Sequence, residues 1–173
     1  MSKEKDKKIN SYLSFKLGDE EFAAHASKVL NILELSKITL VPQAPEYMKG
    51  VINLRGTVLP VIDTRIKFGM SPTEYTTNTC IIVMDIVVDN ESVKLGALVD
   101  AVQAVLEIEP SQIMPAPSIG SRYRSEFIDG VTSINDRFVM ILDMDAIFSS
   151  DDLTSLVETT TQGSLKQSVE EIA

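Results

Sequence analysis

Residues 46–68, EYMKGVINLRGTVLPVIDTRIKF, align without a gap on residues 126–148, EFIDGVTSINDRFVMILDMDAIF, at an offset of 80 positions. Five aligned pairs are identical: Glu46/Glu126, Gly50/Gly130, Val51/Val131, Asp63/Asp143 and Phe68/Phe148. Upstream, residues 22–33 align on residues 95–106 at an offset of 73. Such self-similarity predicts an internal repeat of two similar β units, each ending in a helix capped by its aspartate. On identities alone an alternative stays open, namely that any two hairpins followed by a capped helix look alike.

The segments around the repeat have the composition of strands. Polar and apolar residues alternate over residues 12–17, which is typical of a half-buried strand. Residues 79–88, TCIIVMDIVV, are almost all apolar and predict a central strand covered on both faces. Pro60 lacks a backbone N–H, so its strand is expected at a sheet edge or bulge. The pattern therefore predicts a mainly β fold made of small barrels.

The polar stretch of residues 69–78, GMSPTEYTTN, reads as a linker between two halves. We expect a single domain over residues 11–158, with barrel halves near 11–70 and 78–148 that are either separate or intertwined. An amphipathic helix is expected from about residue 151. Flexible tails are expected over residues 1–10 and 159–173.

The composition disfavours several classes of partner. The chain has 16 Lys plus Arg against 25 Asp plus Glu, a net charge of −9 that repels nucleic acid and anionic membranes. No apolar run approaches the ~20 residues of a membrane-spanning helix, and the charged start MSKEKDKKIN is unlike a signal peptide. Cys80 is the only cysteine, so no internal disulfide forms. These features predict a soluble cytoplasmic protein without direct membrane insertion.

The residues that might carry catalysis have simpler interpretations. His25 is the only histidine, and the chain contains no G-x-S-x-G, H-E-x-x-H or phosphate-binding glycine motif. Cys80 lies in an apolar strand, where burial raises a thiol pKa and the side chain packs as a hydrophobe. Asp143 and Asp145 suggest a cation site, but a helix N-cap explains Asp143 better. We expect no catalytic residue, no metal and no cofactor.

Two features favour binding to other proteins. Arg55 stands in the reversal Asn53-Leu54-Arg55-Gly56 between two apolar strands, where its charge can reach a partner. The alternative is a solvated turn arginine. Residues 40–45, LVPQAP, and 113–117, IMPAP, place apolar side chains in loops, as contact surfaces often do.

The strings GVINLRG, VLPVIDTRIKF, LGALVDAVQAVLEI, QIMPAP, FIDGV and VMILDMDAIF together resemble the CheW coupling proteins of bacterial chemotaxis. The resemblance runs over roughly residues 12–156. It implies two five-stranded, Src-homology-3-like barrels packed together, and an adaptor function. Members of this family couple chemoreceptor (methyl-accepting chemotaxis protein) tips to the regulatory domain of the histidine kinase CheA, in arrays at the inner face of the membrane.

The resemblance also implies two kinds of surface. Receptor contact falls in a groove between the barrels near Val29, Asn31, Arg55, Cys80, Val102 and Val105. Kinase contact falls on a first barrel end near Ile38, Thr39 and Gly50, where the Ile38 side chain is expected to be exposed, and on a second end near Ile113, Met114 and Pro115. The family commonly has Glu where this chain has Asn31, close to the arginine of NLRG.

Alternatives remain at the level of the pathway. A CheW-like coupler of pilus motility or another chemosensory pathway would share this fold and these surfaces. A CheV protein would need a receiver domain and a CheA would need kinase segments, and neither fits into the residues outside 12–156. A small enzyme on a β-barrel scaffold is the distant alternative, since fold alone never excludes catalysis.

Overall fold

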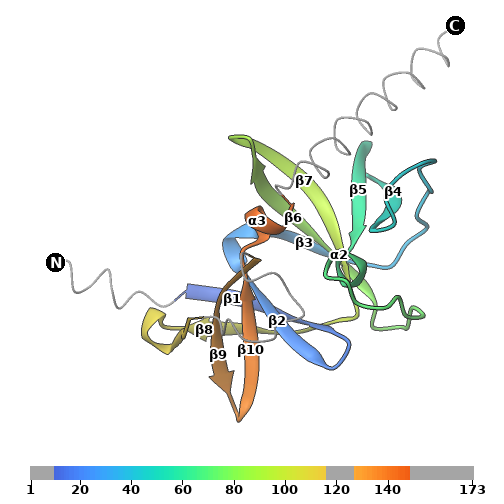
Figure 1. Cartoon of the computed structure of the whole chain (residues 1–173). Helices are drawn as coiled ribbons and strands as arrows, with labels where there is room; N and C mark the ends of the chain where they lie inside the picture. The colour runs from blue at the N-terminus through green and yellow to red at the C-terminus, as the bar shows by residue number, and fades with distance from the viewer. Residues whose placement is uncertain (1–9, 116–126, 149–173) are drawn as a thin grey trace, which may run out of the picture.

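The computed structural model describes residues 10–115 and 127–148. The strands form two five-stranded sheets, seen in Figure 1 as two groups that face each other. One sheet consists of the consecutive strands β3 to β7 in the order β3-β6-β7-β5-β4, and we call it the continuous sheet. The other takes β1 and β2 from the start of the chain and β8 to β10 from its later part, in the order β8-β1-β2-β10-β9, and we call it the split sheet. The predicted mainly β fold with two five-stranded barrels is confirmed.

The strands are β1 (Asn10–Leu17), β2 (Glu20–His25), β3 (Val29–Glu34), β4 (Met48–Leu54), β5 (Thr57–Asp63), β6 (Cys80–Val88), β7 (Glu91–Val99), β8 (Ala101–Ile108), β9 (Ile128–Ile134) and β10 (Arg137–Leu142). The helices are short: η1 (Ala26–Lys28), α2 (Thr64–Lys67), η2 (Pro110–Gln112) and α3 (Met144–Phe148). No helix among the described residues is long and apolar enough to cross a membrane. The helix expected from residue 151 lies outside the described residues, as do both expected tails apart from Asn10.

The two repeats exchange their first hairpins. The β1–β2 hairpin pairs with β8 and β10, whereas the β6–β7 hairpin pairs with β3 and β5. The parallel pair Ile141↔Ala23 in the split sheet matches Val61↔Gly96 in the continuous sheet, at the same offsets of 80 and 73 found in the sequence. The strands therefore divide between the sheets at other points than residues 70–78.

Three apolar clusters fill the fold. One lies within the continuous sheet, another lies within the split sheet, and the largest joins both sheets. On β6, Ile81 and Val83 belong to the continuous sheet's own cluster, whereas Ile82 and Met84 belong to the shared one. Alternate side chains of a strand point to opposite faces, so β6 is covered on both, as the sequence predicted.

Pro60 corrects one expectation. Its strand β5 lies inside the sheet, between β7 and β4, and is not an edge strand. Pro60 pairs with Val51 of β4, but the parallel pairing with β7 begins only at Val61. The proline therefore stands where its strand has a partner on one side only, and no ladder hydrogen bond is lost for want of its N–H.

Three hairpins turn through residues with positive φ: Arg55 and Gly56, Asp89 and Asn90, and Asn135 and Asp136. Two consecutive positive φ values are typical of the type I′ turn, whose twist matches that of paired strands. Asn, Asp and Gly adopt this conformation readily, but Arg55, at φ 52°, is an unusual occupant. The turn holds its backbone in a conformation that arginine does not favour.

Candidate functional site

The residues considered for catalysis have structural roles. His25 ends β2, and its Nδ1 accepts a hydrogen bond from the Ser27 backbone N–H at 3.1 Å, which caps η1. Burial raises the pKa of the Cys80 thiol, and a backbone hydrogen bond from Val102 offsets only part of this rise. The Asp143 carboxylate accepts from the Ala146 N–H at 3.1 Å at the start of α3. Within the described residues no group of three His, Cys, Asp or Glu side chains is placed to hold a metal.

Three of the six residues expected at a receptor groove border the apolar core shared by the two sheets, but Val29 and Cys80 lie at opposite ends of the β3–β6 ladder, where they pair with Met84 and Glu34. Val29, Cys80 and Val102 are partly buried against the shared core, and Cys80 of β6 contacts the backbone of Val102 in β8. β3 and β8 are edge strands of different sheets, so their outer edges remain unpaired. Val105 of β8 is 66% exposed. Partly buried apolar side chains and the unpaired edges of β3 and β8 are therefore found along this boundary in the described part of the chain.

Arg55 and Asn31 line a separate pocket at the open end of the continuous sheet. Its other lining residues are Leu30, Leu54, Thr57, Leu59, Val83 and Lys94. Asn53 stabilises the turn beneath Arg55, because its side chain accepts the Gly56 N–H at 2.8 Å. The Asn31 side chain accepts the Ile32 N–H at 2.8 Å and is held close to its own backbone. Five of the six expected residues thus fall into two sets, a junction set of Val29, Cys80 and Val102 and a pocket set of Arg55 and Asn31, and the exposed Val105 belongs to neither.

The first expected kinase-facing end is a backbone bridge across a glycine. Thr39 and Val51 exchange two hydrogen bonds, of 2.9 and 2.8 Å, which places Ile38 and Thr39 over Gly50. Gly50 is buried with φ 147°, and a Cβ there would lie 2.1 Å from the Thr39 oxygen. The expectation that Ile38 is exposed is wrong, because its side chain is half-buried against the cluster of the continuous sheet. Thr39 is exposed.

The second expected end repeats this construction. Met114 and Val131 exchange two hydrogen bonds of 2.8 Å, and Ile113 lies over Gly130, where a Cβ would come within 2.4 Å of the Ile113 Cγ2. Ile113 packs against the cluster of the split sheet. Met114 and Pro115 are exposed, so this end presents an apolar surface to solvent.

The sequence did not reveal two ion pairs that hold the helices to the sheets, which we call clasps. In the first, Arg65 Nη1 of α2 lies 2.6 Å from Asp100 Oδ2, and the Arg65 Nε donates to the Ser71 oxygen at 3.0 Å. The same Asp100 oxygen accepts the Gly18 N–H of the exchanged β1–β2 hairpin at 2.6 Å. The first clasp therefore ties α2, the start of β8 and the hairpin from the other sheet together.

The second clasp has the same construction with the charges reversed. Lys28 Nζ lies 2.7 Å from Asp145 Oδ2 of α3, and Asp145 Oδ1 accepts the Val87 N–H of the exchanged β6–β7 hairpin at 2.9 Å. Arg65 and Asp145 are separated by the repeat offset of 80. The aligned positions were therefore visible in the sequence, but their opposite charges hid the equivalence.

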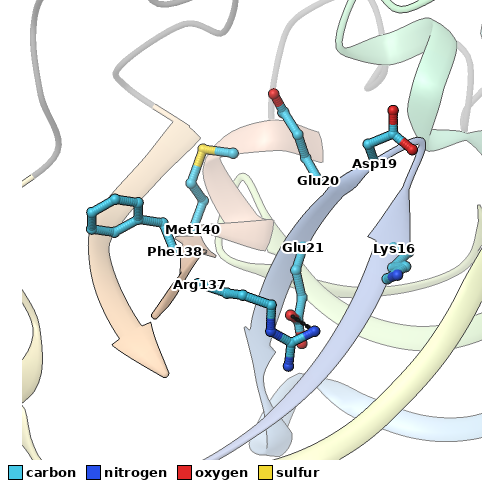
Figure 2. Close-up of a pocket in the computed structure, with 7 residues that line it drawn as sticks. All are labelled: Lys16, Asp19, Glu20, Glu21, Arg137, Phe138 and Met140. Atoms are coloured by element: carbon cyan, nitrogen blue, oxygen red, sulfur yellow. Dashed lines mark ion pairs between the residues drawn. The ribbon is translucent and has the colours of Figure 1, made fainter. Parts of the chain in front are cut away.

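A pocket at the open end of the split sheet lies between β2 and β10. Figure 2 shows Phe138 and Met140 on the β10 side, Asp19 and Glu20 on the other, and an ion pair between Glu21 and Arg137. The Arg137 Nη1 lies 3.5 Å from Glu21 Oε2, and Glu21 is buried. The buried carboxylate at this end of the molecule thus has its cation within the chain.

Comparisons with known proteins agree with this geometry. Residues 11–152 match the family model of the CheW-like domain. The probable chemotaxis protein CheW of Rhizobium etli is 36% identical over 79% of this chain and 86% of that protein. The chemotaxis protein CheW of Rhizobium meliloti is also 36% identical, over 81% of this chain and 88% of that protein. The crystal structure of the scaffolding protein TtCheW from Thermoanaerobacter tengcongensis superposes with a TM-score of 0.74 at 28% identity, covering 84% of this chain and 91% of that one.

Proposed function

The chain belongs to the CheW family of chemotaxis coupling adaptors, and we propose that it joins chemoreceptor tips to the kinase CheA through two separate kinds of surface. It acts without catalysis of its own. It works in the cytoplasm, where receptors recruit it to arrays at the inner face of the membrane. The observation that carries this proposal is the pair of equivalent bridged ends, one in each sheet.

The receptor surface comprises the junction set Val29, Cys80 and Val102, extended by Val105 and by the pocket with Arg55 and Asn31. The partly buried apolar residues of the junction supply a floor on which an apolar helix face packs, as in other grooves that bind helices. The exposed guanidinium of Arg55 adds a charged donor in the separate pocket. An apolar boundary between the sheets and a cationic pocket together support recognition of a helical tip.

The kinase surfaces are the two bridged ends. Ile38, Thr39 and Gly50 form one, and Ile113, Met114 and Pro115 form the other. Both ends expose apolar or uncharged residues on a backbone fixed by two hydrogen bonds. Two equivalent ends allow one adaptor to contact two kinase copies. Each contact is expected to bury less than ~1,200 Å² and to bind in the micromolar range, about −8 kcal/mol, as in exchangeable signalling complexes.

Calorimetric titration tests the proposal with the purified chain, a CheA regulatory domain and a receptor cytoplasmic fragment. We expect micromolar binding to each, and simultaneous binding of both. Absence of heat and of co-elution with either partner at high micromolar concentration would contradict the adaptor function.

A variant at the first bridged end tests the kinase surface. Ile38→Asp should abolish kinase binding by burying an unpaired charge, but because Ile38 is half-buried it should also lower the melting temperature. Leu40→Asp is the matched variant, since Leu40 is 78% exposed in the same segment. It should weaken kinase binding with an unchanged melting temperature. If both folded variants bind the kinase normally, the first end is not a kinase surface.

A further inference from the structure

The pocket at the open end of the continuous sheet combines two cations with an apolar floor. Arg55 and Lys94 line it together with the amide of Asn31, and its floor includes Leu59 and Val83, each only 2% exposed. No aspartate or glutamate is among the residues that line it. In a chain of net charge −9, such a site is an electropositive point on an acidic protein.

Neither cation is neutralised within the described part of the chain. Among residues 10–115 and 127–148, Arg55 and Lys94 form no ion pair. Asp85 stands opposite Lys94 in the β6–β7 ladder, but its carboxylate accepts the Ser92 hydroxyl. Both charges are therefore available to a partner, and the desolvated apolar floor beside them strengthens any bond that they form.

The split sheet supplies an internal comparison. By the repeat offsets, Glu21 and Arg137 occupy the positions equivalent to Lys94 and Thr57, and Asn135 occupies the position equivalent to Arg55. Figure 2 shows this other end with its buried Glu21 paired to Arg137. One end of the molecule pairs its buried charge internally, whereas the equivalent end presents two unpaired cations among the described residues.

We propose that this pocket binds a carboxylate side chain of the receptor tip, clamped between Arg55 and Lys94, with an apolar neighbour packed on Leu30 and Leu54. The proposal rests on the proposed receptor coupling and specifies the partner's chemistry at that surface. Arg55 donates the directional, forked hydrogen bonds, and Lys94 adds a point charge. Asn31 lines the pocket with an uncharged amide, so no acidic side chain of the lining competes for these cations.

The experiment measures the affinity of the full chain for a purified receptor cytoplasmic fragment. Lys94→Glu should weaken binding tenfold or more, because the new carboxylate repels the carboxylate of the receptor. Lys94→Ala should weaken binding about threefold, because it only removes the attraction. Arg55→Glu should act like Lys94→Glu. Raising the salt concentration should weaken the wild type more than Lys94→Ala, since an ion pair with the receptor is screened.

A second variant places the competitor inside the pocket. Asn31→Glu introduces a carboxylate that pairs with Arg55 and Lys94, much as Glu21 pairs with Arg137 at the other end. It should weaken receptor binding several-fold and raise the melting temperature slightly. If Asn31→Glu binds the receptor as tightly as the wild type, Arg55 and Lys94 do not bind a receptor carboxylate and the proposal is wrong.

The matched control is Lys16→Glu, which changes the net charge equally at the pocket of the split sheet. Receptor affinity should fall less in this control than in Lys94→Glu, and kinase affinity should stay unchanged in both. Both variants should lower the melting temperature, because Lys16 stands opposite Glu21 and Lys94 opposite Asp85. Equal losses of receptor affinity in the two variants would show that only the net charge matters, and would contradict binding at the pocket. If Lys94→Glu melts early, Lys94→Gln repeats the test without a like charge near Asp85. A wild type that fails to bind the receptor fragment contradicts receptor coupling itself, whereas normal binding by Lys94→Glu overturns only the pocket.

Discussion

The two bridged ends have nearly the same backbone but tolerate different side chains. Thr39 and Met114 each exchange two hydrogen bonds with a valine that follows a glycine, at 2.8 to 2.9 Å. Gly50 has φ 147°, and a Cβ added there would lie 2.1 Å from a backbone oxygen, whereas at Gly130 the nearest atom is the Ile113 methyl at 2.4 Å. A backbone oxygen, that of Met114, would also lie 2.8 Å from a Cβ at Gly130, but only Gly50 combines a closer backbone contact with a positive φ, so equal hydrogen bonding does not mean equal tolerance.

The clasps extend this comparison to charge. Arg65 and Asp145 are equivalent by the offset of 80, whereas the position equivalent to Asp100 by the offset of 73 is Ser27, the neighbour of Lys28. The two helices therefore carry ion pairs of opposite polarity at closely similar places. The Arg65 side chain is 11% exposed and the Lys28 side chain is 28% exposed, so the two clasps should contribute unequally to stability.

The largest difference between the halves is expected for alanine at the two glycines. Gly50→Ala forces a residue with a Cβ into a positive φ and against the Thr39 backbone, which should cost about 3–5 kcal/mol of unfolding free energy. Gly130→Ala meets the movable Ile113 side chain at 2.4 Å and the Met114 oxygen at 2.8 Å, but needs no positive φ, and should cost about 1–3 kcal/mol. Urea denaturation of both variants measures the difference. Equal losses would mean that the Thr39 strand moves aside as easily as a side chain does.

The next difference is expected at the clasps. Arg65→Ala leaves the Asp100 carboxylate and the Ser71 oxygen without their donor and should cost about 2–3 kcal/mol. Lys28→Ala removes a more exposed pair and should cost about 0–1 kcal/mol. Thermal melts at low and high salt check both values. A larger loss for Lys28→Ala would show that burial does not rank the clasps.

Exchanging the two charged residues of a clasp tests whether the ion pair stabilises the fold equally well with its charges reversed. Lys28→Asp combined with Asp145→Lys should be about 1 kcal/mol more stable than the sum of the two single variants predicts. A double-mutant cycle by denaturation measures this coupling. Zero coupling would mean that the Asp145 bond to the Val87 N–H, and not the ion pair, holds α3.

The smallest expected difference concerns the helix caps. Burial raises the pKa of Asp63, and hydrogen bonds from the Ile66 and Arg65 backbones with the nearby Lys49 offset part of this rise. The folded state therefore binds this proton more tightly than the unfolded chain, so the contribution is present below the unfolded pKa and lost as the pH rises through the folded pKa. Asp63→Asn keeps the cap without this dependence.

The melting temperature of Asp63→Asn should therefore improve relative to that of the wild type as the pH rises from 4 to 7. Asp143→Asn, at the more exposed cap of α3, is the comparison. A relative decline of Asp63→Asn over the same pH range would mean that ionised Asp63 is stabilised by its surroundings.

Local structure was predictable because it follows from short patterns. The apolar run of β6, the cap at Asp63 and the role of His25 all depend on neighbours within a few residues. The repeat was visible because backbone-determining residues such as Gly50 and Gly130 are identical in both copies. At both positions a Cβ would collide with the segment that bridges to the strand, so both copies have glycine.

The exchange of hairpins and the packing of Ile38 were not predictable in the same way. The alternation of polar and apolar residues shows that a strand has two faces, but not which strand pairs with it. The sequence therefore could not decide between separate barrels near residues 11–70 and 78–148 and intertwined ones. Ile38 stands between a polar stretch and two prolines and looked exposed, but the bridge to Val51 presses it onto the core. The clasps could not be found from the repeat, because an alignment compares residues for identity and does not show which opposite charges pair in space.

The exchange of hairpins sets the order in which a ribosome can complete this fold. β1 and β2 are synthesised first, but their partners β8 and β10 begin only at Ala101 and Arg137. The continuous sheet has all its strands once Val99 has emerged, so it is able to close while the earlier hairpin still waits. The oldest part of the nascent chain is thus the last to find its place, with its strand edges open in the meantime. A chain built this way depends on the slow, long-range closure of the split sheet, and its folding rate should be limited there.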